Sequence, residues 1–515
     1  MNNRYLLFTS LLFALFLGSC DRYLDEMPSK SDGIRISTVE ELEALLAKNN
    51  FNGTSIVDNN MASILCSDCF DLSTEYYDKG LKAITTTPEN FQLASWSMAY
   101  TQNTNEKISM WKTNYEAIYL ANLVLTHVET VSGDNQAKET VKQKAHLLRA
   151  YNYLDLVQYY CLPYGKRTLS EPGLPLKRTT GYEEDPRRAT LEETYRFIEA
   201  DITEAAKLQT PLYVDGERKS WKETGALANA TAARFYLLKG EYTKALQHAE
   251  AALKYEDQVL DFRLAENLSS KLTISALTMS FVSVPSWWEK TSDLARYSGD
   301  MSQAYYWKQN YYLSQNIWGI PSKKLLDAYD KDYDLRYRYF IIPNFQAVYY
   351  FGMNALKFLT NVPGYATFNH LFSTAPNVAE MVLTKAECLA RTGATASAMQ
   401  VLNDFRIHRM AANTPADRLA LTATDASVAV QTVLEERMRE MPFTQRWNDI
   451  RRCNFNDDPT DDVVITRNFY HVGEYTVESQ ETVSYQLTPD SRTYAVAIPN
   501  ADIVAGNGLI EQNRY

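Results

Sequence analysis

Aromatic and amide side chains gather in two separated, non-periodic regions of the chain. The six candidates for chemistry are Trp96, Asn103, Trp287, Trp288, Tyr305 and Trp307. An aromatic ring can cover the apolar face of a sugar, and amides can bond its hydroxyl groups. Exposed aromatic side chains on loops indicate recognition. We therefore predict that these six residues bind a ligand, with burial in the core as the alternative for each single Trp.

Motifs of catalysis and metal binding are absent from the sequence. The chain has no H-E-x-x-H, G-x-S-x-G, P-loop or G-x-G-x-x-G pattern, and its 6 His residues form no i,i+4 pair. Cys66 and Cys69 form a C-x-x-C pair, but no second pair stands at zinc-binding spacing. With 63 acidic residues, carboxylate pairs are expected by chance. The sequence thus predicts a binding protein, with no enzyme activity, cofactor or metal.

The charge of the chain argues against two kinds of partner, and its length predicts how it is divided. A net charge of -11 argues against a nucleic-acid surface and against a polybasic membrane patch. A length of 515 residues exceeds one simple core, so we expect two closely packed lobes. The 35 Tyr residues are more than a soluble core requires.

The N-terminus predicts export and lipid anchoring. Arg4 precedes an apolar run at residues 6–17, which is shorter than the about 20 residues that span a bilayer. Its length, charge and position suit a secretory signal peptide, predicted at residues 1–19. The run ends in Leu-Gly-Ser-Cys, similar to a bacterial lipoprotein cleavage box, which predicts a lipid on the thiol of Cys20.

Helical hairpins are the predicted scaffold for these loops. Residues 226–253 describe two amphipathic helices with Gly240 between them, a residue suited to a helix C-terminus. A second copy, residues 380–406, has Gly393 at the matching position. This spacing resembles the tetratricopeptide repeat, whose pairs stack to bury their apolar faces. Residues 111–128 and 141–160 predict two further amphipathic helices.

A dense group of charged residues lies near the C-terminus. Its members are Glu435, Arg437, Arg439, Glu440, Arg446, Asp449, Arg451 and Arg452. On one helix and the following turn, such residues form ion networks. An anion-binding site is the functional alternative, but we favour a structural network that joins the C-terminal lobe to the repeat scaffold.

Several motifs stand in order along the chain. LLRAYNYLDLVQYY is followed by CLPYG and GLPL, VLEERMREMPFTQRWNDIRR comes later, and YAVAIPNADIVAGNGLIEQNRY stands at the C-terminal end. Together they resemble the signatures of the SusD/RagB family of outer-membrane nutrient-binding lipoproteins from Bacteroidetes-type bacteria, with Thr444 and Gln445 in place of the family's usual Glu-Gly. The resemblance runs from Cys20 to Tyr515, with a weak stretch at residues 262–317.

This resemblance implies a fold, a partner and a role. We expect a mainly α-helical protein with tetratricopeptide-like hairpins and a loop-rich C-terminal lobe carrying few short strands, divided into residues 20–260 and 261–515. The family implies capture of an oligosaccharide or polysaccharide at the cell exterior and its delivery to a SusC-like TonB-dependent outer-membrane transporter. Two alternatives stay open: peptide cargo, as in RagB-like relatives, and a protein-interaction scaffold without a nutrient.

Overall fold

Helices dominate the part of the chain that the computed structural model describes. The described residues are 36–51, 61–79, 88–98, 110–181, 183–265, 272–273, 284–285, 306, 311–312, 320–342, 346–351, 354–359, 363–365, 371–372, 374–473 and 477–515.

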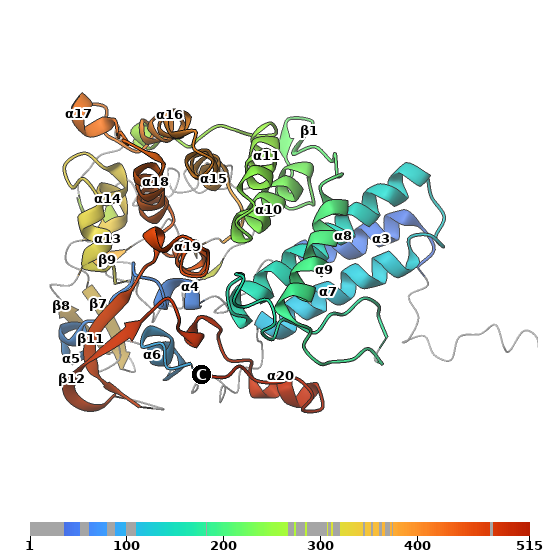
Figure 1. The fold of residues 1–515 in the computed structure, drawn as a ribbon, viewed down its shortest axis with the longest axis horizontal. Coiled ribbons are helices and arrows are strands. Elements are labelled where there is room, and N and C mark those ends of the chain that lie inside the picture. The colour runs from blue at the N-terminus through green and yellow to red at the C-terminus, as the bar shows by residue number, and fades with distance from the viewer. Residues whose placement is uncertain are drawn as a thin grey trace, which may run out of the picture.

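The first long helices form a bundle, on the right of Figure 1. Its members are α3 (Val39–Phe51), α7 (Met110–His127), α8 (Asn135–Tyr160) and α9 (Leu191–Ala205). Asp134 caps α8, while Thr190 and Glu193 form a capping box at α9. These side chains satisfy N–H groups that the first helical turn leaves without a partner.

Two helical hairpins follow, as predicted. One pairs α10 (Gly225–Leu238) with α11 (Tyr242–Leu253), and the other pairs α15 (Val378–Arg391) with α16 (Thr395–Arg406). Gly240 and Gly393 close the turns with φ of 74° and 86°, where glycine has no steric penalty. Helix α11 packs against α15, so the first hairpin stacks on the second (Figure 1). Whether these hairpins belong to the tetratricopeptide class stays a prediction.

The C-terminal half adds two helices that adjoin the second hairpin. Helix α18 (Ala426–Glu440) packs on α15 and α16, and α19 (Arg446–Cys453) contacts α18. The remaining helical segments are short: α4 (Met61–Leu65), α5 (Thr74–Lys79), α6 (Pro88–Ala94), η2 (Phe262–Ala265), α13 (Lys323–Ala328), α14 (Leu335–Phe340), α17 (Ala416–Leu419), η5 (Pro459–Asp461), η6 (Arg492–Tyr494) and α20 (Asn500–Ala505).

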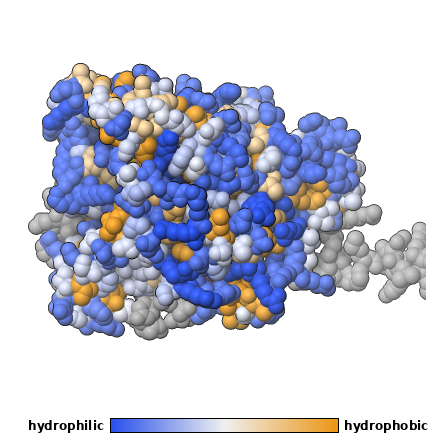
Figure 2. Space-filling view, in the orientation of Figure 1, coloured by the Kyte–Doolittle hydropathy of each residue, from blue (hydrophilic) through white to orange (hydrophobic). Residues whose placement is uncertain are grey.

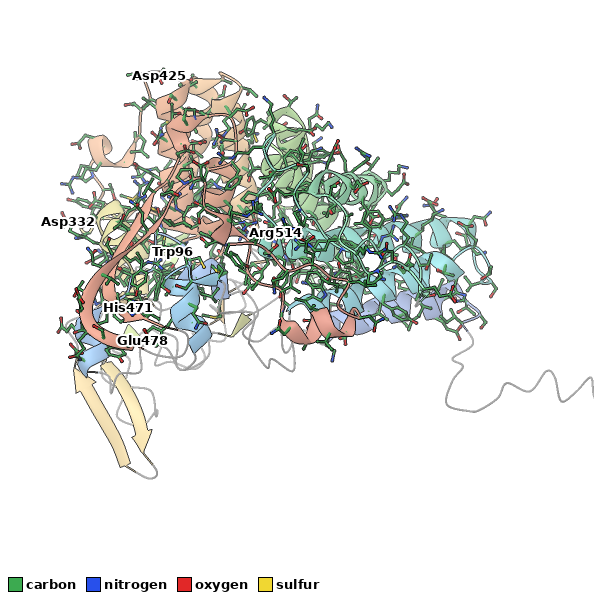
Figure 3. The ribbon with its side chains drawn as sticks, turned by 60° about the horizontal axis from the view of Figure 1, so that its bottom comes forward. Trp96, Asp332, Asp425, His471, Glu478 and Arg514 are labelled. Atoms are coloured by element: carbon green, nitrogen blue, oxygen red, sulfur yellow. The ribbon has the colours of Figure 1, made fainter. Side chains whose placement is uncertain are left out.

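The described strands form antiparallel pairs only. The longest pair is β11 (Ile465–Val472) with β12 (Val477–Leu487). The backbone of the β7–β8 hairpin (Gln346–Phe351 and Asn354–Leu359) projects from the body in Figure 3. The other pairs are β1 (Tyr213–Val214) with β2 (Glu217–Arg218), β3 (Leu272–Thr273) with β4 (Val284–Pro285), β5 (Tyr311–Tyr312) with β10 (Leu371–Phe372), and β6 (Ile341–Ile342) with β9 (Gly364–Tyr365).

The C-terminal segment returns to the first long helices. The Val496 N–H donates to the Tyr159 carbonyl (2.9 Å), and the Asn513 amide donates to the Tyr160 carbonyl (2.9 Å). Ile498 is fully buried in the apolar cluster built by α7, α8, α9 and α10. Residues 496–513 and the helices α7–α10 therefore share one core, and the predicted division at residues 260 and 261 stays a prediction.

The mainly α-helical fold class is confirmed, together with the short strand pairs. Among the described helices, none has the length and apolar character needed to cross a membrane. Apolar side chains lie in small separate groups on the face shown in Figure 2, one of them over α20, where Val504 is 73% exposed.

Candidate ligand-binding site

Residues that flank the two predicted ligand regions bond to one short segment, residues 66–71, which follows α4. The Trp96 indole N–H donates to the Cys66 carbonyl (3.1 Å), just before residues 99–109, which lie outside the described part. On the other side, the Ser322 N–H donates to the Cys69 carbonyl (2.7 Å), and the Asp71 N–H donates to the Ile320 carbonyl (3.0 Å). Two regions far apart in sequence therefore join the folded body side by side.

Trp96 itself lies in the core, at the end of α6. Its side chain is 4% exposed, and Figure 3 shows it inside the body. Its φ of 56° places it in the left-handed position that Gly commonly takes after a helix, and the next N–H, from Ser97, donates to the Gln92 carbonyl (2.8 Å). The expectation of an exposed Trp96 ring is wrong, because tertiary partners bury the ring and satisfy its N–H.

Arg467 of β11 is the main partner of the Trp96 ring. Its guanidinium lies 4.5 Å from the centroid of the Trp96 ring and 5.2 Å from that of Phe70. It also donates to the carbonyls of Leu65 (2.7 Å) and Ser67 (2.5 Å). Burial lowers the pKa of Arg467 to about 10, which leaves it charged at neutral pH. This cation ties the start of the 66–71 segment to β11 and to the Trp96 ring.

Asp68 locks the same segment to α19 and α13. The Arg446 guanidinium donates to both carboxylate oxygens at 2.7 Å, and the Lys324 ammonium lies 2.6 Å from one of them. Burial opposes ionisation of Asp68, but these two cations outweigh it and hold its pKa well below the ordinary value. A bidentate pair of this kind has a defined geometry, so the loop stems have a rigid base.

The other predicted site residues lie outside the described part of the chain. They are Asn103, Trp287, Trp288, Tyr305 and Trp307, and the same holds for Cys20. Tyr306, which stands between two of them in sequence, is fully buried. Its hydroxyl donates to the Glu256 carbonyl (2.8 Å) and its N–H donates to the Pro376 carbonyl (3.0 Å). The chain is thus anchored at this point between two predicted ligand residues.

The predicted charged group is a structural network that is largely buried, with Glu435 exposed. Arg437 pairs with Asp449 at 2.9 Å, and Arg452 pairs with Glu387 of α15 at 2.6 Å. Arg451 donates to the Cys161 carbonyl (2.7 Å) and to that of Tyr494, linking α19 to the end of α8 and to the C-terminal segment. The structural reading of this group is supported, because its members bond to one another and to the scaffold.

The buried thiols are unpaired. Cys66 and Cys69 are free cysteines, both fully buried, and burial raises the pKa of Cys66 to about 12. Cys388 is also fully buried. Among the described residues, no group of three or more His, Cys, Asp or Glu side chains is placed to hold a metal ion.

The structure has two clefts that the sequence did not predict. A cleft of about 620 Å³ has Lys324, Arg446 and Asp462 in its walls, beside the Asp68 ion pair. A second, of about 720 Å³, lies at the turn of the first hairpin and includes Gly240 and Arg391. Charged groups of both signs line each cleft and can bond hydroxyl or amide groups.

Sequence reasoning missed Asp68 and Arg467, the two residues that organise the loop stems. Asp68 stands between the two Cys residues of the C-x-x-C pair. No sequence pattern links it to Arg446, because most of the chain separates the two residues. The sequence did offer one signal. The charged group near the C-terminus contains more Arg residues than its own acidic residues can pair, so some of its Arg residues need partners elsewhere in the chain.

Comparisons with known proteins agree with the family resemblance of the sequence motifs. A family profile described as starch-binding and associating with the outer membrane matches residues 22–237, and the SusD family profile matches residues 377–515. The chain belongs to the SusD/RagB family.

Solved structures share the fold along nearly the whole chain. A SusD superfamily protein from Bacteroides vulgatus has a TM-score of 0.60 at 16% identity, covering 93% of this chain and 99% of its own. A SusD-like protein from Bacteroides fragilis has a TM-score of 0.59 at 16% identity, covering 91% and 95%. Surface glycan-binding protein A from Bacteroides uniformis has a TM-score of 0.56 at 15% identity, covering 92% and 98%. No curated protein matches the sequence.

Proposed function

We propose that this protein is a cell-surface lipoprotein that captures a glycan and delivers it to a SusC-like TonB-dependent transporter in the outer membrane. The observation that carries the proposal is that Trp96, which precedes the first predicted loop, and residues 320–322, which follow the second predicted region, both bond to residues 66–71. Loops that bind a ligand need a rigid base, and the bidentate pair of Asp68 with Arg446 provides one. The predicted ligand residues Trp287, Trp288 and Trp307 carry rings that can stack on successive sugar units of one ligand.

The relatives support a nutrient-binding role. One family profile is described by starch binding and association with the outer membrane, and the Bacteroides uniformis relative is named a surface glycan-binding protein. The predicted lipid on Cys20 would hold the protein at the membrane, since several acyl chains anchor stably where one alone is marginal.

Affinity gel electrophoresis tests glycan capture directly. Protein lacking residues 1–20 is run through native gels that contain single polysaccharides, both neutral and acidic. We expect at least one polysaccharide to retard the protein, and Trp288→Ala to abolish the retardation. Tyr119→Ala is the matched control, because Tyr119 is 45% exposed on α7 and lies outside the proposed site. Unchanged mobility on every glycan would reject carbohydrate capture and leave peptide cargo to be tested.

Delivery to a transporter needs a separate experiment. Full-length protein, lipid anchor included, is purified from outer membranes of its native host in mild detergent. Recovery of a TonB-dependent barrel in stoichiometric amount is the expected result. Purification of the protein without any barrel, from membranes that contain one, would contradict the delivery role.

A further inference from the structure

Asp155 of α8 is an acidic residue without a bonding partner. It is half-buried, yet in the described part of the chain it accepts no hydrogen bond and forms no ion pair. Buried acids of the neighbouring helices, Asp201 of α9 and Glu380 of α15, each pair with an arginine. A polar group that protein atoms surround is rarely left unbonded, so Asp155 calls for a physical explanation.

Arg234 of α10 is the cation whose charge acts on Asp155, but its donors are committed to another acid. Its Nε and one terminal nitrogen donate to the two carboxylate oxygens of Glu380, at 2.8 and 2.6 Å. Both side chains of this pair are buried. Helix α10 contacts α8 as well as α15, so the pair lies where three helices meet (Figure 1).

The other ion pairs of α8 in the described part lie earlier along the helix. They are Lys142–Glu129, Lys144–Glu43, His146–Asp201 and Arg149–Asp201. Beyond the end of the helix, Arg451 of α19 donates to the Cys161 carbonyl. Arg234 is therefore the one charged side chain of the described part that opposes the burial of Asp155. Burial prevails and raises the pKa of Asp155 to about 7.

The start of α15 links this cluster to the second predicted ligand region. Glu380 lies in the first turn of α15, and its N–H donates to the side chain of Asn377, the N-cap residue (2.9 Å). The carbonyl of the preceding residue, Pro376, accepts the Tyr306 N–H (3.0 Å). Tyr306 stands between two predicted ligand residues in sequence. Arg234 thus holds the end of α15 on which that aromatic region is anchored.

We propose that Asp155 is a positioning residue whose proton controls the anchor of Tyr306. While Asp155 is protonated, it is neutral and Arg234 stays on Glu380. When Asp155 releases its proton to solvent, the new buried charge draws Arg234 away from Glu380, because a buried charge is costly without a partner. This inference rests on the proposed function and gives the same ligand site a pH regulation, with tighter binding below neutral pH than above it.

Unfolding at a series of pH values tests the titration. The pKa of Asp155 rises on folding, so its contribution to stability is full below the ordinary value of 3.8 and is lost as pH rises through about 7. Asp155→Asn keeps the shape of the side chain but does not titrate. We expect its unfolding midpoint to gain about 2–3 °C on that of the native protein between about pH 5 and about pH 8. Asp332→Asn, which changes an exposed acid, is the matched control and should show a constant difference.

Hydrogen exchange tests the link to the ligand region. The exchange of peptides that contain Tyr306 is followed by mass spectrometry in native protein and in Asp155→Asn at equal pH, so that the intrinsic pH dependence cancels. We expect equal exchange of the Tyr306 amide at about pH 6, and exchange about tenfold faster in the native protein at about pH 8. Any glycan that retards the protein in gels should retard native protein less at the higher pH, and Asp155→Asn equally at both.

The outcomes separate this proposal from the proposed function. A difference between native protein and folded Asp155→Asn that does not change with pH overturns the proposal, as does equal Tyr306 exchange at every pH. Retardation of native protein that is the same at both pH values overturns the regulation of binding. No retardation by any glycan rejects the proposed function, while unfolding and exchange, which need no ligand, still decide the role of Asp155. If circular dichroism shows that Asp155→Asn is unfolded, the exchange of Tyr306 relative to the amides of α7 in native protein gives the answer.

Discussion

At the scale of single residues, the site is organised by charges buried beside backbone carbonyls. Asp68 lies within the 66–71 segment, and Arg467 donates to a carbonyl of that segment. The protonation state of both side chains is set by the balance between burial and nearby opposite charge. Such groups fix the position of the segment more than they stabilise the folded state. The desolvation of a buried ion pair offsets much of its electrostatic attraction. Breaking one half of the pair is nevertheless costly.

We predict that Trp96→Ala lowers the stability of the folded protein. Its ring is buried among Arg467 and the α4–α6 core, so its removal leaves a cavity and an unpaired carbonyl at Cys66. Loss of a buried aromatic side chain costs about 3–5 kcal/mol. Urea unfolding measures the change, with Trp221→Ala as the control for an exposed Trp. A Trp96→Ala protein of native stability would show that the ring is not part of the core.

Asp68→Asn should destabilise the protein in a pH-dependent manner. Removing one charge of a buried pair costs about 3–5 kcal/mol, because Arg446 keeps its charge without a partner. The pKa of Asp68 is lowered on folding from an ordinary 3.8, so its contribution is present above that value and is lost as pH falls through the folded pKa. The difference between native protein and variant should therefore shrink as pH falls from about 5 to about 3.

Unfolding curves at a series of pH values measure this. Asp332→Asn is the matched control, since the Asp332 side chain is 75% exposed and lies at the edge of the molecule (Figure 3). A difference that stays constant down to low pH would show that the ionised form of Asp68 does not carry the effect.

At the scale of elements, glycines close both hairpins. We predict that Gly393→Ala costs about 1–2 kcal/mol, because a Cβ is unfavourable at its φ of 86°. No atom lies within 4 Å of that Cβ, so backbone strain is the only source of the cost. Thermal or urea unfolding measures it, with Gly181→Ala, at an exposed position without positive φ, as the control. Equal effects of the two substitutions would contradict a left-handed turn.

The sequence predicted the long helices well and their ends less well. The helix predicted at residues 111–128 is α7 (Met110–His127), because its apolar residues recur along its whole length. The helix predicted from residue 141 begins six residues earlier, at Asn135, since its first turns are polar and only the Asp134 cap marks them. The two hairpins were predictable because a Gly and small Ala residues recur at the same spacing in both copies.

The site was less predictable, for a physical reason. Trp96 has a loop-like sequence around it, and its burial depends on Arg467, which only the folded chain brings over its ring. Charge and exposure created by tertiary contacts cannot be inferred from spacing alone.

At the scale of the whole molecule, the C-terminal segment and the first helices form one unit. We predict that Ile498→Ala lowers stability by about 2–5 kcal/mol in a single unfolding transition, because Ile498 is fully buried among α7–α10. Calorimetry measures the transition and its midpoint. Val504→Ala, at a position that is 73% exposed, should change stability by less than about 0.5 kcal/mol. Two separate transitions, with only the later part of the chain affected, would contradict a shared core.

The return of residues 496–515 to α8 has a consequence for biosynthesis. Synthesis releases the N-terminal helices first, yet the apolar cluster of α7–α10 stays open until Ile498 arrives. Helices with an open apolar cluster are targets for chaperones and proteases. We therefore expect the newly made chain to reach protease resistance only after residues 496–515 are released, and termination before residue 496 to lead to degradation instead of a shortened stable protein.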